Sequence, residues 1–308
     1  MLEIATTLGL PFPQQAAKQK DFFLVTEPMA NLQAVLNKFL IAQKLLASEE
    51  ILERLAFEAC EDAFNDGVRI LELRYAPTFI AQGHAHLDFQ KIHQALLQGI
   101  QRAKNQFPLA VGLICILQRV LDLKTVGYVT DFAIENKNSF LALDLADNED
   151  GFEPKNFAPF FQKAKKAGLN ITVHSGESPD PRAGQWIMDS IEILGAQRIG
   201  HGVQAIHHPE VLKALIKNNI ALEICPYSNY LTQAFKTYDT HPLKKLIDLN
   251  VPVTINSDDP GMFASVLSDD YLIAQNYQNV TENDFFKCNE IAYRHSFIPE
   301  SEKQKAWN

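Results

Sequence analysis

Residues that can bind a metal or transfer a proton stand where three short apolar runs end. His174 closes the run LNITVH, and Glu177 follows it across a glycine turn. His201 closes the run RIGH, and Asp258 and Asp259 follow the run VPVTINS. Imidazole and carboxylate groups are zinc ligands, and both also act as general acids or bases. Because the adjacent carboxylates would repel each other unless a cation or donor stabilises them, the pattern predicts a metal site.

Each of these residues also has a structural interpretation, because a polar side chain at a strand end can simply cap the helix that follows. For a single residue, neither interpretation is favoured. The clusters share one feature, which is that parallel strands of a barrel would carry all of them to the same rim. We therefore interpret the set as a functional site.

Short apolar runs alternate with amphipathic stretches along the chain, a pattern typical of repeated βα units around a parallel sheet. Most runs are too apolar to alternate, as expected for strands covered on both faces. One intervening helix is predicted from the apolar face of Phe89, Ile92 and Ala103, with Asp88 as its N-cap. The predicted strands are 69–74, 111–117, 140–145, 171–174, 198–201, 221–224 and 253–255.

The predicted fold is a TIM-type (β/α)8 barrel in the α/β class, with seven of its eight strands visible and a single domain spanning 1–308. Residues 1–8 have apolar side chains at helical spacing before Gly9 and Pro11, which indicates the end of a helix. We expect the missing strand to precede this helix, and residues 14–46 to be an irregular insertion with helical pieces. Two unpaired sheet edges also predict a tendency to aggregate.

Composition narrows the classes of function. The chain has 28 basic and 37 acidic residues and a formal charge of -9, which argues against binding to nucleic acid phosphates or anionic membranes. No basic leader or long apolar run is present, so a cytoplasmic location is expected. Cys60, Cys115, Cys225 and Cys288 have no paired spacing, so neither a disulfide framework nor a thiolate zinc site is predicted. A small neutral or cationic ligand fits this charge better, and the oligomeric state is left open.

The motifs VHSGE, RIGHGV and SDDPG, with Ser228 and Asn229 before the last, occur in the order and spacing of the adenosine deaminase family. The likeness extends through ILELRYAP and LDLADNE, so the chain resembles this family over nearly its whole length, and the bacterial enzymes most. The resemblance implies a β/α barrel with one zinc ion per chain. It also implies hydrolytic deamination of adenosine and 2′-deoxyadenosine to inosine and ammonia in purine salvage.

The resemblance implies a role for each residue at the predicted rim. His174 and Asp258 are implied as zinc ligands. Glu177 is implied as the acid that protonates the purine ring at N1, and His201 as the residue that orients the zinc-bound water and helps to deprotonate it. Asp259 is implied to hold the purine at N7. Zinc suits this chemistry because it lowers the pKa of a bound water to about 7.

The sequence departs from the family pattern near its beginning. The family has two further zinc ligands in a His-x-His-x-Asp-Gly motif at the end of its first strand, and no such motif precedes the first predicted strand here. We therefore expect the natural chain to extend beyond Met1. His84, His86 and Asp88 reproduce the letters of the motif in GHAHLD, but the segment does not close an apolar run, so we reject it as a ligand pair.

A second departure is Asp147, which stands where the family has glycine, and an added carboxylate there could change the preference among aminopurines. Two alternatives to adenosine deamination remain open: deamination of adenine or another 6-aminopurine, and binding of purine by a non-catalytic relic. Glu72 and Arg74 point to one barrel face and are interpreted as a structural pair. Tyr227, Ser228 and Asn229 either line the pocket or only form loop hydrogen bonds.

Overall fold

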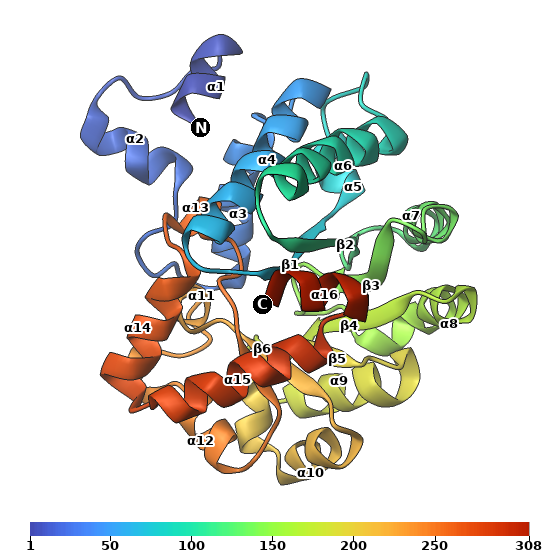
Figure 1. The fold of residues 1–308 in the computed structure, drawn as a ribbon, viewed down its shortest axis with the longest axis vertical. Coiled ribbons are helices and arrows are strands. Elements are labelled where there is room, and N and C mark those ends of the chain that lie inside the picture. Colours follow the sequence, from blue (N-terminus) through green and yellow to red (C-terminus); the bar gives the residue numbers. More distant parts are fainter. Residues whose placement is uncertain (308) are drawn as a thin grey trace.

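A computed structural model describes residues 1–307, with residues 16 and 17 described by their backbone alone. Seven parallel strands form one sheet in sequence order, which curls into an incomplete barrel (Figure 1). Every predicted strand is confirmed to within one residue at either end. The strands are β1 (Ile70–Tyr75), β2 (Ala110–Gln118), β3 (Phe140–Ala146), β4 (Asn170–Ser175), β5 (Arg198–His201), β6 (Ala221–Ile224) and β7 (Val253–Ile255).

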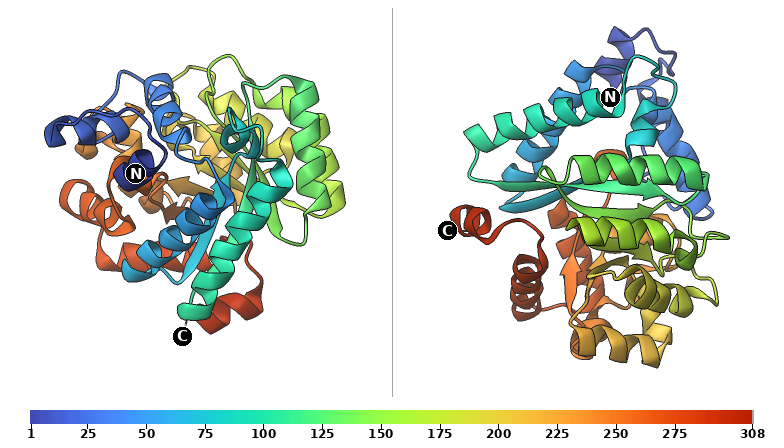
Figure 2. Two further views of the ribbon diagram at one scale, coloured as in Figure 1. Left: turned by 90° about the horizontal axis from the view of Figure 1, so that it is seen from above. Right: turned by 90° about the vertical axis from the view of Figure 1, so that its right-hand side faces the viewer.

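Helices follow the strands in turn and cover the outside of the sheet (Figures 1 and 2). The α-helices are α1 (Leu2–Thr7), α2 (Ala16–Phe23), α3 (Leu32–Gln43), α4 (Glu49–Asn65), α5 (Pro77–Ala81), α6 (Phe89–Gln106), α7 (Leu123–Glu135), α8 (Ala158–Ala167), α9 (Ala183–Asp189), α10 (Pro209–Asn218), α11 (Pro226–Leu231), α12 (Leu243–Asp248), α13 (Pro260–Phe263), α14 (Leu267–Gln278), α15 (Glu282–His295) and α16 (Glu300–Trp307). The shorter turns are the 3₁₀ segments η1 (Pro154–Phe157), η3 (Val203–His207) and η4 (Tyr238–Thr240) and the π segment η2 (Ser190–Leu194).

Local signals explain why the chain folds this way. The Asp88 carboxylate accepts the backbone N–H of Lys91 at 2.8 Å and so caps α6, whose apolar face buries Ile92 and Ala103, as predicted. Gly168 ends α8 with a left-handed φ of 99°. These signals place the amphipathic helices against the outer face of the strands.

The interior of the barrel is ionic rather than apolar. Arg74 contacts Asp144 at 2.9 Å and Glu223 at 3.0 Å, whereas Glu72 contacts Arg198 at 2.6 Å. The predicted pairing of Glu72 with Arg74 was therefore wrong. Residues two apart on one strand share a face, but each of these finds its opposite charge across the barrel.

The segment before β1 contacts the carboxyl end of the sheet. It begins with α1, as the spacing of residues 1–8 predicts, and continues through the helical pieces α2 and α3. The N–H of Val25 donates to the carbonyl of Met262, and the N–H of Met29 donates to that of Leu231, each at 2.9 Å. The predicted insertion is thus bonded to the segments that follow β6 and β7.

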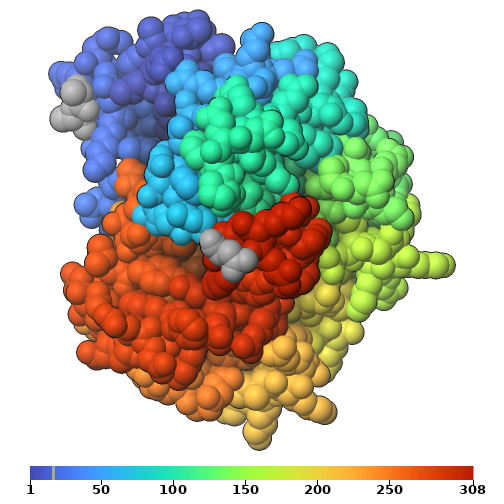
Figure 3. All heavy atoms as spheres, viewed as in Figure 1, coloured from blue at the N-terminus to red at the C-terminus, as the bar shows by residue number. Residues whose placement is uncertain are grey.

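The C-terminal helices close the opposite side of the molecule. Figure 3 shows this segment, in red, against the cyan and green surface of the first βα units, and Lys104 pairs there with Glu302 at 2.6 Å. The cysteines are all free and buried. Within the part of the chain that the structure describes, no helix is both long and apolar enough to cross a membrane.

Candidate active site

The histidines at the ends of β4 and β5 lie side by side. The two strands pair in register, His174 with Gly200 and Ser175 with His201. The imidazole rings of His174 and His201 have centroids 5.3 Å apart. Asp258 reaches the same place from the segment after β7, and one donor atom from each of the three side chains lies within 4.8 Å of the others. The carboxyl-end rim of the sheet therefore gathers three of the predicted site residues.

Two of these residues have unusual backbone conformations. His201 has a φ of 56° and Asp258 a φ of 58°, in the left-handed region that non-glycine residues rarely adopt. Such conformations cost free energy and concentrate at functional sites, where the surrounding structure enforces them. Both side chains thus leave their strand ends at an angle that ordinary extended backbone would not give.

Glu177 lies beside His201, and its position is set by a turn. Its Oε2 is 3.5 Å from Nε2 of His201, and its Oε1 accepts the hydroxyl of Thr232 at 2.7 Å. Gly176 makes the turn with a φ of 76°. The buried carboxylate of Glu149 accepts the N–H groups of Gly176 at 2.8 Å and Glu177 at 2.9 Å. Burial raises the pKa of Glu177, so the group keeps its proton to a higher pH than an exposed glutamate.

The two aspartates that follow β7, Asp258 and Asp259, have different surroundings. Asp258 accepts the Ser228 hydroxyl at 2.6 Å, and its Oδ2 is 3.9 Å from Nε2 of His201. Burial, followed by the charge of Asp258, raises the pKa of Asp259 well above its ordinary value. Asp259 therefore holds a proton to a higher pH than an exposed aspartate.

His174 is oriented by a buried carboxylate. Its Nδ1 lies 3.0 Å from Oδ1 of Asp144, whose side chain is fully buried. Burial would raise the pKa of Asp144, but His174 and Arg74 outweigh it and hold this pKa below its ordinary value. The Asp144 carboxylate in turn raises the pKa of His174 to about 8 against the effect of burial. This arrangement leaves Nε2 of His174 as the atom free to bind a ligand, as in histidines that coordinate metals.

Several neighbours of the site have contacts that the sequence did not predict. Asn229 bonds to His201, and His241 bonds to Asn229. Thr232 and Glu149 both hold Glu177 in place. Ser228 and Asn229, for which pocket lining was one of two interpretations, both contact residues of the site. Their sequence signal was their place after the end of a predicted strand, and Glu149 stands in the motif LDLADNE.

The histidines rejected as ligands lie elsewhere. Nε2 of His86 is 2.8 Å from the carbonyl of Ala47, and Nε2 of His84 is 3.5 Å from that of Gln43. Neither belongs to the cluster of metal-donor side chains found in the described residues. They connect the loop before α6 to the last residue of α3 and to the segment that follows it.

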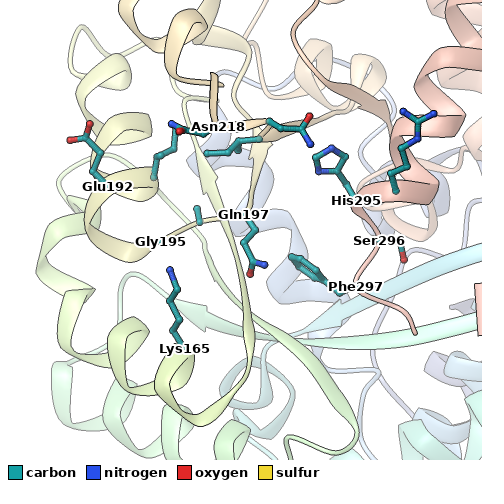
Figure 4. Close-up of a pocket in the computed structure, with 13 residues that line it drawn as sticks. Lys165, Glu192, Gly195, Gln197, Asn218, His295, Ser296 and Phe297 are labelled. Atoms are coloured by element: carbon teal, nitrogen blue, oxygen red, sulfur yellow. The ribbon is translucent and has the colours of Figure 1, made fainter. Parts of the chain in front are cut away.

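A surface hollow at the other end of the sheet is separate from this site. It is lined by Lys165, Gln197, Asn218 and His295 among others, which lie near the amino ends of β4 to β6 (Figure 4). Reactive groups in β/α barrels collect at the carboxyl ends of the strands. The hollow therefore lies at the wrong end of the barrel for the chemistry of His174 and its neighbours.

Comparison with known proteins shows to which family the chain belongs. The family model described as adenosine deaminase matches residues 1–308. The chain belongs to the adenosine deaminase family. The adenosine deaminase of Plasmodium knowlesi is 34% identical over 290 residues, covering 92% of this chain and 78% of the relative. That of Pectobacterium atrosepticum is 34% identical over 281 residues, covering 91% and 82%.

Solved structures agree on the fold of this adenosine deaminase family member. The adenine deaminase of Arthrobacter aurescens has a TM-score of 0.90 at 21% identity and covers 98% of this chain and 90% of its own. An amidohydrolase from Burkholderia ambifaria with bound zinc has a TM-score of 0.85 at 20% identity, covering 98% and 82%. The N6-mAMP deaminase of Arabidopsis has a TM-score of 0.84 at 25% identity, covering 99% and 91%. The predicted TIM-type fold is confirmed.

Proposed function

We propose that the chain hydrolytically deaminates adenosine and 2′-deoxyadenosine to inosine and ammonia. Family membership supports this reaction, as do the names of the Plasmodium and Pectobacterium relatives. The observation that carries the proposal is the convergence of His174, His201 and Asp258 beside Glu177 at one rim of the sheet. Such a hydrolysis needs imidazole groups, a carboxylate that can bind a metal, and a carboxylic acid that can donate a proton.

We propose one zinc ion per chain, held by His174 and Asp258 among the described residues. The donors fit, because Nδ1 of His174 is taken by Asp144 and Nε2 remains, while Asp258 offers a carboxylate oxygen. The zinc of the Burkholderia neighbour supports this choice of metal. When bound, zinc would supply Lewis acidity and make a coordinated water more acidic.

Side chains of the protein transfer the proton, bind the purine and orient the water. Glu177, whose pKa is raised by burial, donates to N1 of the purine and makes C6 more electrophilic. The Thr232 hydroxyl on Oε1 leaves Oε2 of Glu177 to carry that proton. Asp259, whose pKa burial also raises, donates to N7, which can only accept. His201 orients the attacking water.

The charges near the site favour a nucleoside over a nucleotide. The segments that directly follow β2, β3 and β4 carry three cations, and each is already bonded, whereas exposed Lys236 after β6 bonds only to Gln233. Arg119 is buried against the carbonyls of Phe152 and His174, and Lys155 pairs with Glu153 at 2.6 Å. Arg182 pairs with Asp180 at 2.9 Å. We propose a neutral purine nucleoside as the substrate, because a 5′-phosphate beside the described ends of β2 to β4 would meet only cations that are already bonded.

The test is release of ammonia from adenosine by the zinc-loaded protein and by Glu177→Gln. The variant keeps the shape of Glu177 and its bond to Thr232 but removes the acid, so kcat should fall by about 10²–10⁴-fold with zinc content unchanged. Glu192→Gln, an exposed change of the same kind on η2, should keep full activity.

Two other outcomes would replace the proposal. Zinc-loaded protein that binds purine nucleoside without releasing ammonia would be a binding protein. A preference for adenine of about tenfold or more, about 1.4 kcal/mol at the transition state, would make the chain an adenine deaminase. The second outcome would make Asp147 the candidate cause of the changed preference. Asp147 has a φ of 83° and accepts a hydrogen bond from Nε2 of Gln118 at 2.9 Å.

A further inference from the structure

Three buried side chains form a continuous hydrogen-bonded series behind the reacting centre. They are His201, Asn229 and His241, which we call the His241 relay, and their exposed fractions are 3%, 0% and 5%. The series starts at α12 and ends on the side of His201 opposite Glu177. Because no member has room to reorient towards solvent, each hydrogen bond restricts the next.

The first hydrogen bond of the series determines which atoms donate and which accept along it. The backbone N–H of Leu243, in the first turn of α12, has no partner within the helix and points at Nδ1 of His241, 3.3 Å away. A backbone N–H can only donate, so Nδ1 of His241 is an acceptor. Burial lowers the pKa of His241 to about 3 against the effect of a hydrogen bond with Gln278, so the ring is neutral. Because its Nδ1 accepts from Leu243, the single proton is on Nε2. That proton is donated to Oδ1 of Asn229 at 3.2 Å.

The orientation of the Asn229 carboxamide determines which nitrogen of His201 accepts a hydrogen bond. Since the Asn229 oxygen accepts from His241, its NH₂ group faces the other way and donates to Nδ1 of His201 at 3.1 Å. Nδ1 of His201 therefore accepts, so the ring proton is on Nε2. That N–H faces two carboxyl oxygens, Oε2 of Glu177 at 3.5 Å and Oδ2 of Asp258 at 3.9 Å.

We propose that Asn229 and His241 are positioning residues that hold His201 as the tautomer with its proton on Nε2. This inference rests on the proposed function and specifies the role of His201 within it. A nitrogen that carries a proton cannot coordinate a metal, so His201 acts as a hydrogen-bond donor to the water at the reacting centre. Of the three clustered donors, His174 and Asp258 then remain for zinc. His201 orients the water, and it does not take a proton at Nε2 in this state.

The experiment reads the tautomer directly. Long-range ¹H–¹⁵N spectra of the zinc-loaded, ¹⁵N-labelled protein at a pH of about 8 distinguish protonated from unprotonated ring nitrogens. The signals of His201 are identified by their absence in His201→Gln. We expect an unprotonated Nδ1 and a protonated Nε2 in the unsubstituted chain.

Asn229→Asp tests the relay itself. A carboxylate accepts from both neighbouring rings, so it should draw the proton of His201 to Nδ1 and leave Nε2 unprotonated. We expect the reversed tautomer, with kcat lowered by about 10²-fold and KM nearly unchanged. Asn105→Asp, the same change on the exposed face of α6, should alter neither the tautomer nor kcat.

Two results would overturn the inference: a proton on Nδ1 of His201 in the unsubstituted chain, or Asn229→Asp with the original tautomer retained. If Asn229→Asp does not fold, the spectrum of the unsubstituted chain decides alone. The tautomer is read without substrate. Hence a chain with the expected tautomer that releases no ammonia from adenosine would refute the proposed function and leave the relay standing.

Discussion

His93 is a buried imidazole outside the candidate site. Its Nδ1 lies 2.8 Å from the hydroxyl of Tyr75, and its Nε2 lies 2.7 Å from that of Ser139. The ring stacks on Phe140 with centroids 4.3 Å apart. Burial lowers the pKa of His93 to about 4, whereas an unfolded chain would hold the group near 6.5. The folded protein thus keeps this ring neutral under conditions in which the unfolded chain charges it.

The pH dependence of stability follows from that difference. Because the folded pKa is the lower one, the contribution of His93 is complete above about pH 6.5 and is lost as the pH falls towards 4. We expect the free energy of unfolding to fall by about 2–3 kcal/mol over this range on account of His93. Urea titrations of His93→Gln should show a smaller fall in the free energy of unfolding over this pH range. Those of exposed His86→Gln should show the same fall as the unsubstituted chain. Equal declines in all three proteins would refute the assignment.

Individual site residues could be predicted where type and position coincide. His174, His201 and Asp258 close or follow apolar runs, and parallel strands bring such ends together. Asn229, Thr232 and His241 could not be assigned roles, because amides, hydroxyls and imidazoles in loops bond equally well to backbone or solvent. Their partners depend on how the segment after β6 folds over the neighbouring strand ends, and no spacing in the sequence records this.

At the scale of elements, the strands were predictable because each is a buried apolar run with a polar boundary. The pairing of Glu72 with Arg74 was not, since proximity on one strand does not determine which charge is nearest across a barrel. The insertion before β1 could be outlined, but its bonds to Met262 and Leu231 join segments more than two hundred residues apart. Such contacts follow from closure of the whole sheet.

The turn after β4 depends on a loop from the neighbouring strand. One oxygen of Glu149 accepts the N–H of Gly176, and the other accepts those of Glu177 and Ser178. Glu149→Gln would place an NH₂ group against a backbone N–H and remove a charge-assisted bond. Because the turn carries Glu177, we expect kcat to fall about tenfold and the melting temperature to drop.

Exposed Glu135→Gln at the end of α7 provides the matched control for this prediction and should leave both quantities unchanged. Kinetics and thermal melts of the two variants, measured side by side, check the prediction. If Glu149→Gln kept the original kcat, then Glu149 would not position Glu177.

At the scale of the whole molecule, the sheet is open within the described residues. β1 pairs with β2 alone and β7 with β6 alone. The N–H of Ala110 donates to the carbonyl of Arg69, so alternate residues of β1 face β2. The backbone groups of Ile70, Glu72 and Arg74 therefore face away from β2. An unpaired parallel edge of this kind is a template for another strand.

We expect the chain to self-associate through this edge as its concentration rises. Light scattering during size-exclusion chromatography should give a mass above the 34.6 kDa of one chain. Ile70→Pro removes an outward-facing donor at the first residue of the strand, where proline is tolerated, and should shift association to higher concentration. Ile70→Ala loses similar packing but keeps the donor, so it should associate like the original chain. A constant mass of one chain at every concentration would show that the edge is covered in solution, because an exposed row of backbone donors and acceptors would find partners.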